Sequence, residues 1–129
     1  MEEFLVDLNN EIYLQSASNG ETTQDTFFEI ISDLLIDDGV CKEAQIVNDW
    51  NNEKTGIQID GYGGDPFNDE NILTVFLVSF SSSNEIVGIN MAELTSLIKR
   101  GANYINKIRN NEFVSSLEKT SSMFLVSQF

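Results

Sequence analysis

The stretch Ile-Leu-Thr-Val-Phe-Leu-Val-Ser-Phe at residues 72–80 constrains the fold of this chain more than any other feature. It is rich in β-branched and aromatic residues, which favour β-strands. Apolar side chains fall on both of its alternating faces, so we predict a strand at the centre of a sheet. The polar run at residues 81–84 ends this strand.

A shorter strand is expected before this one. Isoleucines alternate with polar residues from Ile57 to Asp60, which predicts a strand that ends near Tyr62. Glycines and a proline at residues 61–66 predict a turn rather than regular structure. This turn lacks both the G-x-G-x-x-G pattern and a Walker Lys-Ser/Thr, so we do not interpret it as a phosphate-binding loop. Residues 44–50 are a weaker candidate for a third strand.

Helices are expected on both sides of the strands along the chain. The spacing of Phe4, Leu8 and Ile12 predicts an amphipathic helix over residues 2–16. A second and more apolar helix is expected over residues 24–38, between a threonine cap and a glycine.

The C-terminal third of the chain predicts further helices. Asn90 and Glu93 have the spacing of a capping box, and apolar residues follow at helical intervals. The pair Asn110-Asn111 ends this helix, and a shorter helix is expected after it. Residues 123–129 form an apolar tail that we expect to be uncovered, and residues 123–126 are the only candidate there for the start of a further strand.

The chain of 129 residues therefore predicts a single α+β domain over residues 1–129. We expect two N-terminal helices, a small and mainly antiparallel sheet of about three strands, and one or two C-terminal helices. The acidic N-terminus differs from a secretory signal, and no apolar run approaches the ~20 residues that span a bilayer. We therefore expect a cytoplasmic protein with no membrane partner, and the sequence does not predict its oligomeric state.

The charge of the chain is strongly negative and unevenly distributed. Residues 1–98 hold 19 acidic residues against Lys42 and Lys54, and the net charge of the whole chain is −14. Residues 99–129 are weakly basic. A surface of this sign repels nucleic acid, so binding of DNA or RNA is disfavoured outside the last basic helix.

The side chains that are missing limit the available chemistry. The chain has no histidine and a single cysteine, Cys41. Triads of the Ser-His-Asp and Cys-His kinds are therefore excluded, as are an internal disulfide and a zinc finger. Catalysis would require carboxylates, Lys, Tyr, Ser or Thr, or a metal with oxygen ligands.

Four carboxylates near the glycines suggest a metal site of that kind: Asp60, Asp65, Asp69 and Glu70. Their spacing does not match the calcium-loop pattern D-x-[DN]-x-[DN]-G. For the last three, a solvated acidic loop is the favoured interpretation. Asp60 ends a strand beside a longer strand, where it can hold a metal ion or can cap the glycine turn through local hydrogen bonds.

The order and spacing of several short segments also resemble a known family. Over residues 4–126 the chain is similar to the N-terminal region of abortive-infection phage-resistance (AIPR) proteins. The resemblance is carried by Phe27-Phe28-Glu29, Ile59-Asp60-Gly61-Tyr62, residues 73–80, Leu117-Glu118 and Ser121-Ser122. It implies a restriction-endonuclease-like core of the PD-(D/E)xK type, as the N-terminal module of a larger defence protein.

The resemblance also implies particular site residues. In that chemistry a strand Asp and a carboxylate on the next strand hold Mg²⁺, and a nearby Lys helps to activate water. The strand Asp corresponds to Asp60, as catalytic residue and metal ligand, and the upstream helix acid corresponds to Glu29. The next-strand positions fall near Leu77 and Ser79, which supply neither the second carboxylate nor the lysine. The nearest lysines, Lys54 and Lys99, lie elsewhere in the pattern.

Three hypotheses for function follow. The favoured one is a non-catalytic, nuclease-like module that needs no cofactor and acts in docking or recognition. Its partner would be another protein or the remainder of a longer chain. The first alternative is a Mg²⁺-dependent nuclease that uses Asp60 and Glu29, with Asp65 or Glu70 as displaced ligands. The second is an acidic protein-binding module, suggested by the charge of residues 1–98.

Overall fold

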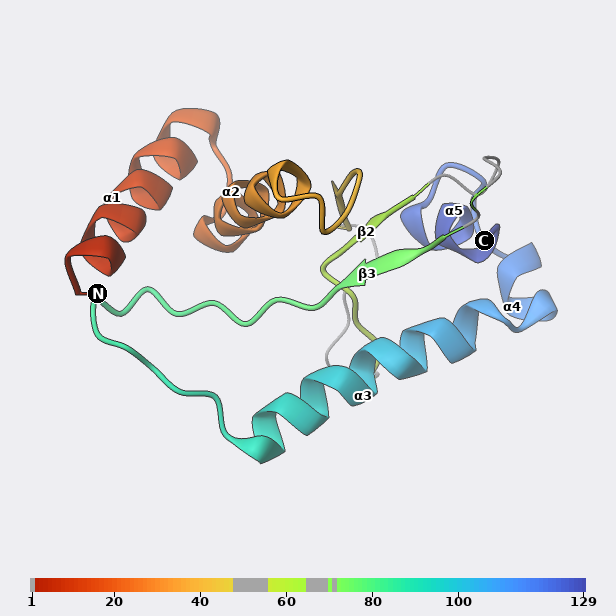
Figure 1. Cartoon of the computed structure of the whole chain (residues 1–129). Helices are drawn as coiled ribbons and strands as arrows, with labels where there is room; N and C mark the ends of the chain where they lie inside the picture. The colour runs from red at the N-terminus through yellow and green to blue at the C-terminus, as the bar shows by residue number, and fades with distance from the viewer. Residues whose placement is uncertain (1, 48–55, 65–69, 71) are drawn as a thin grey trace.

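The computed structural model describes residues 2–47, 56–64, 70 and 72–129. Within these residues the chain forms five helices and a three-stranded sheet (Figure 1). The predicted α+β class is therefore confirmed. The elements in chain order are α1 (Glu2–Asn19), α2 (Thr23–Asp37), β1 (Gln45–Ile46), β2 (Gly61–Gly63), β3 (Thr74–Phe76), α3 (Met91–Ile108), α4 (Asn111–Ser115) and α5 (Ser122–Ser127).

The sheet is antiparallel and has the order β1-β2-β3. The prediction that residues 72–80 form its central strand is wrong, because β3 lies at the edge and β2 in the middle. Both faces of this segment are nevertheless covered by helices. The Phe76 ring meets Phe28 of α2 edge-on at 5.4 Å, and Leu77 lies against Gly101 of α3. This double coverage explains why the segment is apolar on both faces.

The glycines predicted as a turn form the central strand instead. Strand β2 pairs Gly61 with Phe76 and Gly63 with Thr74. A Cβ on Gly61 would collide with the Phe28 ring, and a Cβ on Gly63 would collide with the Glu43 carbonyl. Only glycine permits this close approach of helix and neighbouring strand. The chain leaves β2 at Gly64, whose φ is +114°.

The main core lies between the sheet and the C-terminal helices. It contains Val47, Ile59, Tyr62, Tyr104, Ile108, Met123 and Val126. The expectation of an uncovered tail is wrong, and residues 123–126 do not begin a further strand. Residues 122–127 form α5, so three helices follow the sheet rather than one or two. Met123 is 0% exposed and Val126 is 1% exposed, because α5 inserts its apolar face into the core.

The helix ends follow the predicted capping signals. The Thr22 hydroxyl accepts a hydrogen bond from the Asp25 N–H at 3.1 Å, and Asn90 Oδ1 accepts one from Glu93 N–H at 2.8 Å. Gly39 follows α2 with a φ of 76°. In the part of the chain that the structure describes, no helix combines the length and apolar character needed to cross a bilayer.

Candidate functional site

Asp60, the predicted metal ligand, lies directly before β2 and is 7% exposed. Its backbone joins the neighbouring strands, since its N–H donates to the Phe76 carbonyl at 2.9 Å and its carbonyl accepts from Val47 N–H at 3.0 Å. Its carboxylate accepts hydrogen bonds on both oxygens. Oδ1 accepts from Gln58 Nε2 at 3.0 Å, and Oδ2 accepts from the Val78 N–H at 2.7 Å. The carboxylate thus satisfies donors from two segments of the chain.

Gln58 links this carboxylate to α3. Its backbone N–H donates to the Arg100 carbonyl at 3.2 Å, and Asn103 Nδ2 of the same helix donates to the Gly56 carbonyl at 3.0 Å. Gln58 Oε1 and Arg100 Nε are buried without a hydrogen-bond partner among the described atoms. Residues 56–60 are therefore held to the helix by polar contacts, and Asp60 is the acidic member of this buried polar group.

Leu77 and Ser79, near which the family resemblance places the next-strand positions, lie just after β3. Gly61 pairs with Phe76, so Asp60 and Leu77 each lie just outside the paired residues of β2 and β3. Leu77 packs on α3, where a Cβ on Gly101 would lie 2.9 Å from Leu77 Cδ1. Ser79 is exposed at the side of an apolar groove. Neither residue can provide a second carboxylate or an amine, and Lys99 is exposed on α3.

Glu29, the predicted helix acid, lies half-buried on α2. Burial raises the pKa of its carboxyl above the ordinary value of 4.5, and the negative charges of Glu21, Asp33 and Asp25 raise it further. A hydrogen bond between the Glu29 and Glu21 side chains acts in the same direction. Glu29 is therefore surrounded by acids on its own side of the domain.

Asp60 and Glu29 are not gathered into one metal-binding cluster. The Asp60 carboxylate is bonded to Gln58 and Val78, whereas Glu29 lies near Glu21, Asp25 and Asp33. Across residues 2–47, 56–64, 70 and 72–129, no group of three or more Asp, Glu, His or Cys side chains is arranged to hold a metal ion.

The remaining acids of the predicted cluster add little to this site. Glu70 forms an exposed ion pair with Lys42. Asp65, Asp69 and Lys54 lie outside the described residues.

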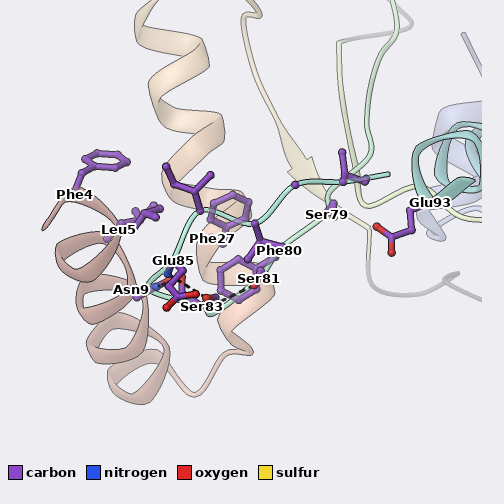
Figure 2. Close-up of a pocket in the computed structure, with 15 residues that line it drawn as sticks. Phe4, Leu5, Asn9, Phe27, Ser79, Phe80, Ser81, Ser83, Glu85 and Glu93 are labelled. Atoms are coloured by element: carbon purple, nitrogen blue, oxygen red, sulfur yellow. Dashed lines mark hydrogen bonds between the residues drawn. The ribbon is translucent and has the colours of Figure 1, made fainter. Parts of the chain in front are cut away.

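A groove that the sequence did not predict lies between α1, α2 and the chain that follows β3 (Figure 2). We call residues 77–89 the connecting arm, because they run from β3 towards α3 without forming a helix or a strand (Figure 1). The groove has a volume of about 490 Å³. Its lining is mainly apolar and includes Leu5, Phe27, Phe80 and Ile86.

The groove contains a pair of aromatic rings and is bordered by polar contacts between α1 and the connecting arm. The rings of Phe27 and Phe80 lie 4.9 Å apart between centroids, with their planes tilted by 31°. Asn9 of α1 holds the connecting arm. Its Nδ2 lies 3.3 Å from the Ser82 carbonyl, 3.0 Å from the Ser83 carbonyl and 2.9 Å from Asn84 Oδ1. These contacts fix the connecting arm relative to α1, and the groove lies between them.

One sequence signal could have indicated the groove. Residues 86–89 read Ile-Val-Gly-Ile, an apolar run in a segment that becomes neither helix nor strand. Ile86 is 70% exposed, Val87 is 61% exposed and Ile89 is 44% exposed. Several neighbouring apolar side chains with this exposure are unusual on a soluble domain unless they serve as a binding surface.

The family model for the abortive infection phage resistance protein N-terminal domain matches residues 27–129. The chain belongs to this family. The match begins at Phe27 in α2 and includes Asp60, the sheet and the three C-terminal helices. No curated protein and no solved structure matches the chain.

The AIPR match confirms the family resemblance seen in the sequence. It includes Phe27 and the whole connecting arm, whereas α1 and Asn9 lie before it. The groove therefore has one wall inside the matched region and one wall outside it. The restriction-endonuclease-like core stays a prediction, as do the roles of Asp60 and Glu29.

Proposed function

We propose that this AIPR N-terminal domain is a non-catalytic module of a phage-defence protein and acts in docking or recognition. The family match supports the role in phage resistance. The observation that carries the non-catalytic part is the bonding of Asp60, whose two carboxylate oxygens accept hydrogen bonds from Gln58 and Val78. These bonds give Asp60 a structural role at a position that is only 7% exposed, where Mg²⁺, which usually keeps several of its waters, binds less readily than at an open carboxylate.

The surroundings of Asp60 support the same proposal. A Mg²⁺ site in a nuclease gathers carboxylates and a group that activates water. Leu77 and Ser79, just after β3, supply no carboxylate, and Glu29 lies among acids on the helix that Gly61 faces. A single carboxylate without these neighbours is a weak metal site.

Docking on another protein, or on the remainder of a longer chain, suits the charge of the domain. Residues 1–98 carry 19 acidic residues against two lysines. This charge repels nucleic acid and attracts basic protein surfaces. The nuclease alternative with Asp60, Glu29 and Mg²⁺ instead predicts that the domain cleaves nucleic acid. A cleavage assay therefore separates the two hypotheses.

The test compares the parent protein with Asp60→Asn, Glu29→Gln and the exposed control Asp7→Asn. Linear DNA and single-stranded RNA are incubated with each protein in Mg²⁺ or Mn²⁺. We expect no cleavage above buffer for any of them. In urea, Asp60→Asn should lower the free energy of unfolding by about 1–3 kcal/mol, because the buried hydrogen bonds are disturbed. Asp7→Asn should stay within about 0.5 kcal/mol.

Metal-dependent cleavage by the parent that disappears in Asp60→Asn would instead establish the nuclease alternative. Loss of cleavage in Glu29→Gln as well would place both carboxylates in the reaction. Cleavage that survives both substitutions would indicate a contaminating enzyme.

A further inference from the structure

The groove between α1, α2 and the connecting arm is an apolar surface left open in a charged domain. Phe4 on its α1 side is 60% exposed, and Ile86 and Val87 on its arm side are 70% and 61% exposed. A site for a small molecule buries most of its ligand and is largely enclosed by its lining. Apolar side chains this exposed on both sides of the groove fit a larger occupant.

We propose that this groove binds a basic amphipathic helix of a protein partner. The proposal rests on the docking function and names its surface and the chemistry of its partner. Helices of this kind place an apolar stripe in a hydrophobic groove and leave their charged residues at its edges. The backbone hydrogen bonds of the connecting arm favour a helix over a strand. The charge of the lining favours a basic partner over an acidic one.

The backbone of the connecting arm is already engaged over its central residues. Asn9 contacts the carbonyls of Ser82 and Ser83, the Ser81 hydroxyl accepts from Ser83 N–H at 3.3 Å, and the Ser83 hydroxyl accepts from Glu85 N–H at 3.1 Å. An added strand would need these backbone groups for its own ladder. The groove therefore offers apolar side chains, which suits the stripe of an amphipathic helix.

The charge of the lining selects a basic partner. Glu85 and Glu93 line the groove, and neither Lys nor Arg is found among the described residues that line it. Glu3, Asp7 and Glu11 are exposed on α1, the helix that forms one wall. Lysines or arginines beside the apolar stripe of a partner helix would meet these carboxylates, and an acidic helix would be repelled.

The test uses a fluorescein-labelled helical peptide of Leu and Lys, about three turns long, and a matched peptide with Glu in place of Lys. Fluorescence anisotropy measures binding to the parent, to Ile86→Ser and to Ile98→Ser. Ile98 is 55% exposed on α3 and does not line the groove, so it is the matched control. We expect Ile86→Ser to weaken binding about tenfold and Ile98→Ser to leave it unchanged.

A second pair of variants tests the charge. Glu85→Gln should weaken binding of the Leu/Lys peptide by about two- to fivefold at low salt, and this loss should shrink as salt is added. Glu118→Gln, an exposed acid near α5, is the control. Amide chemical shifts of the ¹⁵N-labelled domain should change in α1 and residues 79–89 when the Leu/Lys peptide is added.

Three results would overturn the proposal: no binding at millimolar peptide, equal losses in Ile86→Ser and Ile98→Ser, or shift changes confined to other surfaces. Equal binding of the Leu/Glu peptide would show that the groove does not select a basic partner. These outcomes are separate from the nuclease assay, because a catalytic domain would reveal itself through Asp60 whether or not the groove binds a helix. Thermal melts of both Ser variants confirm that each is folded.

Discussion

Residues 76–89 contribute first to the surroundings of Asp60 and then to the groove. The two parts of this stretch are held in different ways. At Phe76 and Val78 the backbone bonds to Asp60, with helices covering both faces. A few residues later the arm is held by a side chain, Asn9, and its apolar residues are left open. The first region uses its polar and apolar groups for folding, whereas the second leaves its apolar side chains available for binding.

The contrast between these two regions indicates where function is to be sought in the domain. A residue that matches a catalytic pattern can still hold segments of the fold together, as Asp60 does through Gln58 and Val78. A segment without any motif can present a surface that folding alone does not explain. We expect substitutions in the two regions to differ as strongly in their effect on the free energy of unfolding as the regions differ in geometry.

The largest contrast is expected from the same substitution made in each region. Ile59 is 0% exposed in the core beside Asp60, and Ile86 is 70% exposed in the groove. Ile59→Ala should lower the free energy of unfolding by about 2–5 kcal/mol, because it leaves a cavity. Ile86→Ala should change it by no more than about 0.5 kcal/mol. Urea unfolding followed by far-UV circular dichroism measures both values.

If Ile59→Ala does not fold, Ile59→Val should still cost about 0.5–1.5 kcal/mol. A loss of more than about 1 kcal/mol in Ile86→Ala would show that the groove contributes to folding. The division between the two regions would then be incorrect.

A smaller effect is expected where α1 holds the connecting arm. Asn9→Ala removes side-chain contacts to Ser82, Ser83 and Asn84 that are largely exposed, so the free energy of unfolding should fall by about 0.5–1 kcal/mol. The local effect should be clearer, with lower ¹⁵N order parameters at residues 82–85. Asn10→Ala, the exposed neighbour on α1, is the control. Unchanged order parameters in Asn9→Ala would mean that the arm is fixed by its apolar contacts.

Local signals in the sequence predicted the helices well. A cap is formed by side chains within one turn, so Thr22 and Asn90 could be identified from their neighbours alone. Two neighbouring strand segments were also located, since Gly61 and Phe76, which pair in the sheet, lie within the two expected strands. The carboxylate of Asp60 differs, because its bond to Val78 N–H exists only once the strands have paired.

The errors arose where distant segments decide the structure. Glycines favour turns and also permit close packing, and the ring of Phe28 determines which applies at Gly61. A short apolar run such as residues 123–126 has no clear period, so its helical state depends on the Ser121 cap and on the core. The groove needs α1, α2 and the arm together, and no single segment predicts it.

The smallest effect is expected at Glu29, which neither region uses. Its pKa is raised in the folded protein, mainly by burial, so the native state holds this proton more tightly than the unfolded chain does. The charged form therefore destabilises the fold at pH 7, and this penalty disappears as the pH falls through the raised pKa towards 4.5. Glu29→Gln should raise the free energy of unfolding at pH 7 by about 0.5 kcal/mol or less, and the gain should shrink at lower pH.

Any removal of negative charge relieves repulsion in a domain with a net charge of −14, so this gain needs a matched comparison. Glu118→Gln removes the same charge at an exposed position near α5. Chemical unfolding of both variants at several pH values between 5 and 7 separates the local effect from the general one. If both variants gain the same free energy of unfolding at every pH, Glu29 affects stability only through the overall charge. A loss of stability in Glu29→Gln would instead indicate that its carboxylate accepts a bond the fold requires, which would make it resemble Asp60.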